Sequence, residues 1–149
     1  MAMIKLYEMC SQVSWADVID KLNHEVHNNT AKIMGTTYVL HNDYRPNTLQ
    51  KAYEEVVLSK ADMHVYVSFA SDSPTFGTHK DEDDVLIVQA IGEMKYFIED
   101  QWIRIVPGQH IYIPMGVYHT PVVLTPRVTL SFSSNEYEIV TSVHPFGDA

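Results

Sequence analysis

Two histidines and one aspartate have the residue types and the spacing of a metal site. His79 and Asp81 lie two positions apart, so on an extended segment both side chains project to the same side. His119 follows a Pro114-x-Gly116 turn, which would end a strand sharply and set the imidazole into the same space. Two imidazoles and one carboxylate leave one side of a metal open, an arrangement suited to non-haem Fe(II). We therefore predict that His79, Asp81 and His119 are the metal ligands and form the catalytic centre.

The segments that carry these residues have a β-type pattern. From residue 64 onward, short runs of β-forming residues alternate with turn residues, which is typical of an all-β barrel or sandwich. The predicted strands are 64–70, 84–91, 94–98, 102–106, 110–113, 120–124 and 127–133.

The first third of the chain is predicted to be largely helical. Apolar residues recur at helical spacing from Trp15 to Val26, with Ser14 as the N-cap and Asp17 placed to complete the cap. A second helix is predicted from residue 47 to about 59, and a strand over 34–40 lies between the two helices. The expected architecture is mainly β, with two N-terminal helices packed on one sheet of a single barrel.

Two of the predicted strands, 64–69 and 127–133, alternate between apolar and polar residues, so each has one apolar face. The amphipathic helices need an apolar surface to cover, and these faces are the natural candidates. The opposite face would then point into the barrel and form a binding cavity; a solvated sheet face is the alternative. The residues on that face are His64, Tyr66, Ser68, Arg127, Thr129 and Ser131.

Both ligand-bearing segments resemble motifs of a known superfamily. The pattern Gly108-x5-Pro114-x-Gly116-x2-His119 matches the second cupin motif at every fixed position. Segment 76–92 resembles the first motif as it occurs in the JmjC-like branch, whose members are Fe(II)- and 2-oxoglutarate-dependent hydroxylases with His-x-Asp and a distal His as ligands. The resemblance covers about residues 65–133. It extends beyond the ligands to Asp84, Gln89 and Gly92.

The resemblance implies a single cupin domain, a double-stranded β-helix, over residues 1–149. The helical part would span about 1–62, the barrel about 63–134 and a C-terminal tail 135–149. It also implies an Fe(II)- and 2-oxoglutarate-dependent oxygenase that uses O2. The compact size and acidic character of the chain favour a small molecule or a peptide as its substrate. The alternatives are a metal-dependent cupin dioxygenase or isomerase that does not use 2-oxoglutarate, and a non-catalytic metal- or ligand-binding cupin. The resemblance also admits a homodimer, since cupin sheets often pair.

The sequence departs from the family pattern at two positions. Val85 stands where ordinary cupins have a glutamate ligand, which favours a site with three ligands over one with four. Met94 stands where the JmjC-like hydroxylases have a cation that binds the far carboxylate of 2-oxoglutarate. Lys95 is one position away and would face the other side of its strand unless a bulge re-aims it.

Arg127 is the better candidate for this cation, because it opens the last strand on the predicted cavity face and a guanidinium binds a carboxylate bidentately. That no such cation exists is the third possibility. Further cofactor-binding hydrogen bonds are expected from Tyr66, Ser68, Thr129 and Ser131.

The amino-acid composition disfavours some classes of binding partner and indicates a location in the cell. The formal net charge is −9 at pH 7, which argues against nucleic-acid or anionic-membrane binding, because both need clustered Lys and Arg. Cys10 is the only cysteine, so no intrachain disulfide can form. No apolar run approaches membrane-spanning length, and no signal-peptide pattern is seen. We expect a cytoplasmic protein.

Overall fold

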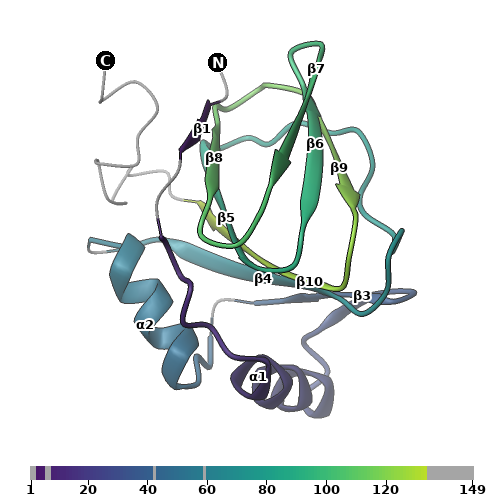
Figure 1. The fold of residues 1–149 in the computed structure, drawn as a ribbon. Helices are drawn as coiled ribbons and strands as arrows, with labels where there is room; N and C mark the ends of the chain where they lie inside the picture. The colour runs from purple at the N-terminus through teal and green to yellow at the C-terminus, as the bar shows by residue number, and fades with distance from the viewer. Residues whose placement is uncertain (1–2, 6–7, 42, 59, 134–149) are drawn as a thin grey trace.

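Two antiparallel β-sheets form the walls of a barrel in the computed structural model, which describes residues 3–5, 8–41, 43–58 and 60–133 (Figure 1). The larger sheet has the strand order β1-β8-β5-β10-β4-β3-β2 and the smaller sheet β7-β6-β9. The strands of the larger sheet are β1 (Met3–Lys5), β2 (Lys32–Met34), β3 (Thr37–Leu40), β4 (Asp62–Ser68), β5 (Val85–Ile91), β8 (His110–Ile113) and β10 (Arg127–Ser133). Those of the smaller sheet are β6 (Met94–Ile98), β7 (Gln101–Ile105) and β9 (His119–Val123). The predicted mainly-β barrel is confirmed.

Two helices cover the outer face of the larger sheet. Helices α1 (Trp15–His27) and α2 (Asn47–Val56) both lie on the side of this sheet that faces away from the barrel (Figure 1). Their buried side chains join the apolar faces of β4 and β10 in one core, as the alternation of these strands predicted. Burying each such side chain stabilises the fold by about 1.5–3 kcal/mol. The core residues are Val18, Leu49, Val56, Val65, Val67, Val128, Leu130 and Phe132.

Helix α1 begins as predicted but buries a different face. The Ser14 hydroxyl accepts a hydrogen bond from the backbone N–H of Asp17 at 3.2 Å. Ile19 and Val26 are exposed, whereas Lys21 and Glu25 are buried and form an ion pair of 2.7 Å. The ammonium group of Lys21 also donates to the carbonyls of residues 43 and 44, which anchors the helix to the loop before α2. Neither described helix is long and apolar enough to cross a membrane.

The first third of the chain is less helical than predicted. The single strand predicted over 34–40 is a hairpin, because Gly35 adopts a φ of 57° and turns the chain between β2 and β3. Strand β1, which pairs with β8, was not predicted, and α2 ends three residues before the predicted residue 59. Strands β1, β2 and β3 all belong to the larger sheet. The predicted tail 135–149 lies outside the described residues.

The barrel interior is not uniformly polar. Apolar side chains from both sheets form a second core between the walls, so only part of the interior matches the predicted polar cavity. This core contains Val85, Ile87, Met94, Tyr96, Ile98, Ile105, Ile111, Ile113 and Val123. The polar part lies beside it, along the inner face of β10.

Gly92, between β5 and β6, sits where no side chain fits. Its φ is 75°, and a Cβ atom there would lie 2.0 Å from the carbonyl oxygen of Pro126. We expect Gly92→Ala to lower the free energy of unfolding by about 3 kcal/mol, because left-handed strain adds to overpacking against backbone. Urea unfolding followed by tryptophan fluorescence measures this loss.

Gly77 provides the matched control. Its φ is 73°, but nothing lies within 4 Å of the position of a Cβ atom. Gly77→Ala should therefore cost only about 1 kcal/mol, the strain alone. Equal losses in the two variants would contradict the role given to the contact between Gly92 and Pro126.

Candidate metal centre

A backbone bridge brings the two predicted histidine ligands together. His79 and His119 exchange both hydrogen bonds of an antiparallel pair, with N···O distances of 3.0 and 2.9 Å. Paired residues of this kind project to the same side, and the two imidazole centroids are 4.3 Å apart. The bridge therefore joins the segment before β5, in the larger sheet, to the start of β9, in the smaller one.

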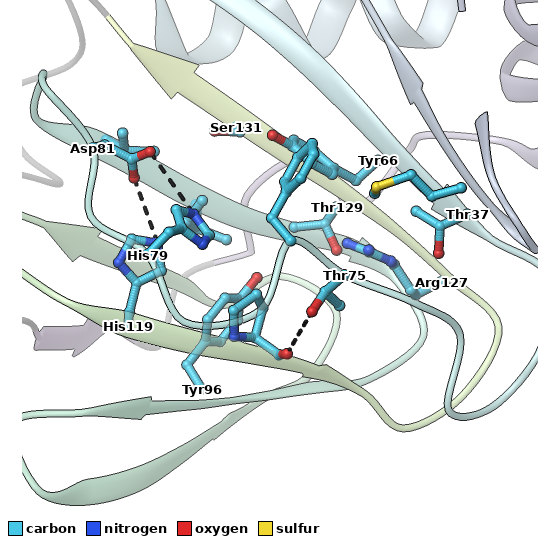
Figure 2. Close-up of a pocket in the computed structure, with 15 residues that line it drawn as sticks. Thr37, Tyr66, Thr75, His79, Asp81, Tyr96, His119, Arg127, Thr129 and Ser131 are labelled. Carbon is cyan, nitrogen blue, oxygen red and sulfur yellow. Dashed lines mark hydrogen bonds and ion pairs between the residues drawn. The ribbon is translucent and has the colours of Figure 1, made fainter. Parts of the chain in front are cut away.

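The Asp81 carboxylate faces both imidazoles (Figure 2). Its oxygens lie 3.8 Å from Nε2 of His79 and 3.4 Å from Nε2 of His119. All three ligand atoms lie within 4.8 Å of one another. Ligand atoms about 2.1 Å from one metal and at right angles to each other are roughly 3 Å apart. Small side-chain rotations would thus bring the three atoms onto one divalent ion.

Both imidazoles are held in the tautomer that binds metal through Nε2. Nδ1 of His79 lies 2.8 Å from the carbonyl oxygen of Gly77, and Nδ1 of His119 lies 3.0 Å from that of Val117. A carbonyl only accepts, so Nδ1 carries a hydrogen, and in the neutral ring the lone pair is then on Nε2. Burial lowers the pKa of His119, which keeps this ring neutral.

The site is buried on one side and accessible on the other. The side chain of His119 is 4% exposed, whereas those of His79 and Asp81 are 31% and 34% exposed. A metal held by the three atoms would therefore keep open positions toward the pocket.

Arg127 occupies the other end of the same pocket (Figure 2). The residue is 3% exposed, its Nε donates to Ser68 Oγ at 2.9 Å, and the guanidinium carbon lies 5.6 Å from the centre of the Tyr66 ring. Burial lowers its pKa, but a guanidinium stays protonated at neutral pH. No acidic side chain of the described residues forms an ion pair with it. A buried cation without such a partner favours an anionic ligand.

A bulge and a hydrogen-bonded glutamine determine how the side chains on the inner face of β10 are oriented. The register between β5 and β10 shifts between Val128 and Thr129, and bulges of this kind re-aim side chains near sites. The Thr129 hydroxyl donates to the buried Gln89 side chain at 2.9 Å, and the Gln89 amide donates to the carbonyls of residues 91 and 92. Gln89 thus finds the partners that a polar residue on a buried strand requires.

Most of the predicted site residues line one pocket. Around the candidate metal ligands and Arg127 it is lined by Tyr66, Thr129 and Ser131, together with residues that were not predicted to line a cavity. These are Met34, Thr37, Thr75, Phe76, Val85, Ile87, Tyr96 and Pro121. Tyr96 could have been found, because it alternates with Met94 and Ile98 on the inner face of β6. Thr37 could not, since its hairpin was not recognised.

Three predicted residues do not line this pocket. Ser68 lies behind Arg127 and orients it through Nε. His64 packs against His41, with ring centroids 5.6 Å apart. Lys95 was wrongly included as a candidate cation: its ammonium lies 4.5 Å from the centre of the Trp102 ring on the outer face of β6, because no bulge reverses the alternation with buried Met94.

Comparisons with known proteins identify the fold. No protein-family model and no curated protein matches the sequence. Among solved structures, the chain is similar to YcfD, a ribosomal oxygenase from Escherichia coli, with 18% identity and a TM-score of 0.53 over 69% of this chain and 33% of that one. Another YcfD structure contains cobalt and 2-oxoglutarate.

Two further solved structures are similar to this chain. Salicylate 1,2-dioxygenase from Pseudoaminobacter salicylatoxidans, in complex with gentisate, has 12% identity and a TM-score of 0.54 over 79% of this chain and 30% of that one. A cupin superfamily protein from Desulfitobacterium hafniense has 12% identity and a TM-score of 0.51 over 68% of this chain and 80% of that one. The protein therefore has the cupin fold, as its two motifs indicated. It spans about a third of the length of the two named enzymes.

Removing either imidazole should abolish metal binding. We expect His79→Ala and His119→Ala each to weaken Co(II) affinity at least 100-fold, because each substitution leaves only two of the three ligand side chains. Isothermal titration with Co(II), followed by metal analysis of the dialysed protein, measures the loss. His24→Ala, which removes an exposed imidazole on α1, is the control and should bind as the wild type does. Unchanged binding by both site variants would refute the ligand assignment.

Proposed function

We propose that this protein is an Fe(II)- and 2-oxoglutarate-dependent oxygenase that acts on a small molecule or a peptide. One observation carries the proposal: three candidate metal-ligand side chains line the same pocket as a buried guanidinium that has no acidic partner among the described residues. A dicarboxylate that chelates a metal through one end and carries its second carboxylate at the other end matches these two features. We also propose a cytoplasmic location for the protein. The Cys10 side chain stays a protonated thiol, because burial raises its pKa.

The metal ligands fix the place of the reaction. His79, Asp81 and His119 would hold Fe(II) from one side and leave room for a chelating co-substrate and O2. Together, bound Fe(II), 2-oxoglutarate and O2 supply the oxidation of a substrate C–H bond, with succinate and CO2 as co-products. The carbonyls of Gly77 and Val117 keep both imidazoles oriented, so the ligands need little reorganisation when metal binds.

Arg127 would bind the far carboxylate. Ser68 holds Nε, which leaves the two terminal nitrogens of the guanidinium to donate to the two carboxylate oxygens. Tyr66, Thr129 and Ser131 line the space between this group and the metal ligands and offer further polar atoms. The Tyr66 phenol keeps its proton, because burial and the charge of Asp81 raise its pKa, so it is available as a donor.

A second candidate function keeps the metal and replaces 2-oxoglutarate by the substrate itself. The site would then belong to a dioxygenase or isomerase that binds a small carboxylate directly between the metal and Arg127. Met94, which is fully buried in the apolar core where the JmjC-like hydroxylases have a cation, favours this candidate. So does the similarity to salicylate 1,2-dioxygenase.

Anaerobic titration of the Fe(II) protein with 2-oxoglutarate separates the two candidates. We expect a visible metal-to-ligand charge-transfer band that saturates at one equivalent, followed by succinate formation once O2 is admitted. Arg127→Gln should weaken 2-oxoglutarate binding at least tenfold and leave Fe(II) affinity unchanged, because it removes the carboxylate contact and no metal ligand.

Lys95→Gln is the matched control, since it removes a cation on the outer face of the same barrel. It should bind both Fe(II) and 2-oxoglutarate as the wild type does. Fe(II) loading without a band and without succinate would reject the 2-oxoglutarate oxygenase. Equal effects of the Arg127 and Lys95 substitutions would reject the role of Arg127.

A further inference from the structure

The carboxylate of Asp84 links the two segments that carry the metal ligands. One oxygen accepts the Tyr112 hydroxyl at 2.6 Å, and the other accepts the backbone N–H of Met115 at 2.8 Å. Asp84 follows Asp81 by three residues on the first segment, and Met115 precedes His119 by four on the second. One side chain therefore connects the end of the first segment with the turn that leads into the second.

The turn held by Asp84 orients His119. Within it, the N–H of Val117 donates to the carbonyl of Pro114 at 3.2 Å, and the carbonyl of Val117 accepts Nδ1 of His119 at 3.0 Å. The neighbouring N–H of Gly116 donates to the carbonyl of Asp81 at 3.0 Å. The position of this turn thus sets both the direction of the His119 ring and the place of the Asp81 backbone.

We propose that Asp84 is a positioning residue for the metal centre. By fixing the turn through Met115, it sets the distance between Nε2 of His119 and the Asp81 carboxylate, 3.4 Å in this structure. Its role rests on the metal site proposed above and is independent of 2-oxoglutarate. Hydrogen bonds to a carboxylate are stronger than neutral ones, and Tyr112 is itself buried in the larger core, so the link is anchored to a rigid strand.

Charge attraction and fold stabilisation are two further ways in which Asp84 can affect metal binding. A negative charge near the site would attract a cation from a distance, and the same hydrogen bonds would stabilise the fold without affecting metal geometry. Asp84→Asn removes the charge but keeps an oxygen for the Met115 N–H and an amide that can donate to the Tyr112 oxygen. Glu82→Ala removes an exposed charge from the same acidic run, and Tyr112→Phe removes the hydrogen bond from Tyr112 to Asp84 but leaves the carboxylate and its bond to Met115 in place.

The test is Co(II) binding by the full chain, measured as a dissociation constant and as the visible d–d spectrum, with thermal unfolding in parallel. Loss of partners that orient metal ligands typically weakens metal affinity on the order of 10- to 100-fold. We expect such a loss and an altered spectrum in Asp84→Ala, a smaller loss in Tyr112→Phe, and affinities within about threefold of wild type in Asp84→Asn and Glu82→Ala.

Each contrary outcome overturns a distinct part of the proposal. Wild-type affinity and spectrum in both Asp84→Ala and Tyr112→Phe, even with lower thermal stability, would mean that Asp84 is structural only. A loss in Asp84→Asn and Glu82→Ala equal to that in Asp84→Ala would mean that charge alone acts. If Asp84→Ala does not fold, the spectrum of Tyr112→Phe decides. A wild-type protein that binds no Co(II) would overturn the metal site itself and the role of Asp84 with it.

Discussion

The backbone bridge between His79 and His119 is the contact on which the site depends. The two residues are 40 positions apart in the sequence, and their segments belong to different walls of the barrel. Neither wall carries the candidate metal site alone: β9 contributes one imidazole, and the segment before β5 contributes the other with the carboxylate. Closure of the barrel at this edge therefore brings the three candidate ligands together, and the carbonyls of Gly77 and Val117 orient each ring through its Nδ1 at the same time.

The interior of the closed barrel has an apolar part and a polar part. Side chains such as Met94 and Ile111 fill the space between the sheets. Beside them, β10 places Arg127 in the pocket with Ser68 behind it, and the close approach at Gly92 fixes the start of this strand. Arg127 has no acidic partner among the described residues, and burying such a guanidinium costs stability that an anionic ligand would recover.

The sequence predicted the parts of the structure that depend on local pattern. Motif spacing indicated three side chains whose possible ligand atoms lie within 4.8 Å of one another, and alternation along 127–133 correctly assigned the apolar face of β10 to the helices. The sequence does not reveal pairing between distant segments: β1 is three residues long and is recognisable only from its pairing with β8. The turn at Gly35 was also missed, because it depends on a left-handed backbone within an otherwise continuous β-type run. Lys95 is an example, because its direction depended on whether β6 contains a bulge, which the sequence does not reveal. The register of β6 is regular, and the bulge lies in the pairing of β5 with β10. Lys21 and Glu25 are buried for a similar reason, since their partners lie on a loop that no helical pattern includes.

The central claim is that one pocket joins a three-ligand metal site to a carboxylate-binding arginine. A crystal structure of the protein grown with Co(II) and 2-oxoglutarate, with anomalous data at the cobalt edge, tests it most directly. We expect a single strong peak shared by Nε2 of His79, Nε2 of His119 and the Asp81 carboxylate. We also expect the dicarboxylate to extend from this peak to the guanidinium of Arg127. A peak elsewhere, or a dicarboxylate that reaches the metal but leaves Arg127 uncontacted, would contradict the claim.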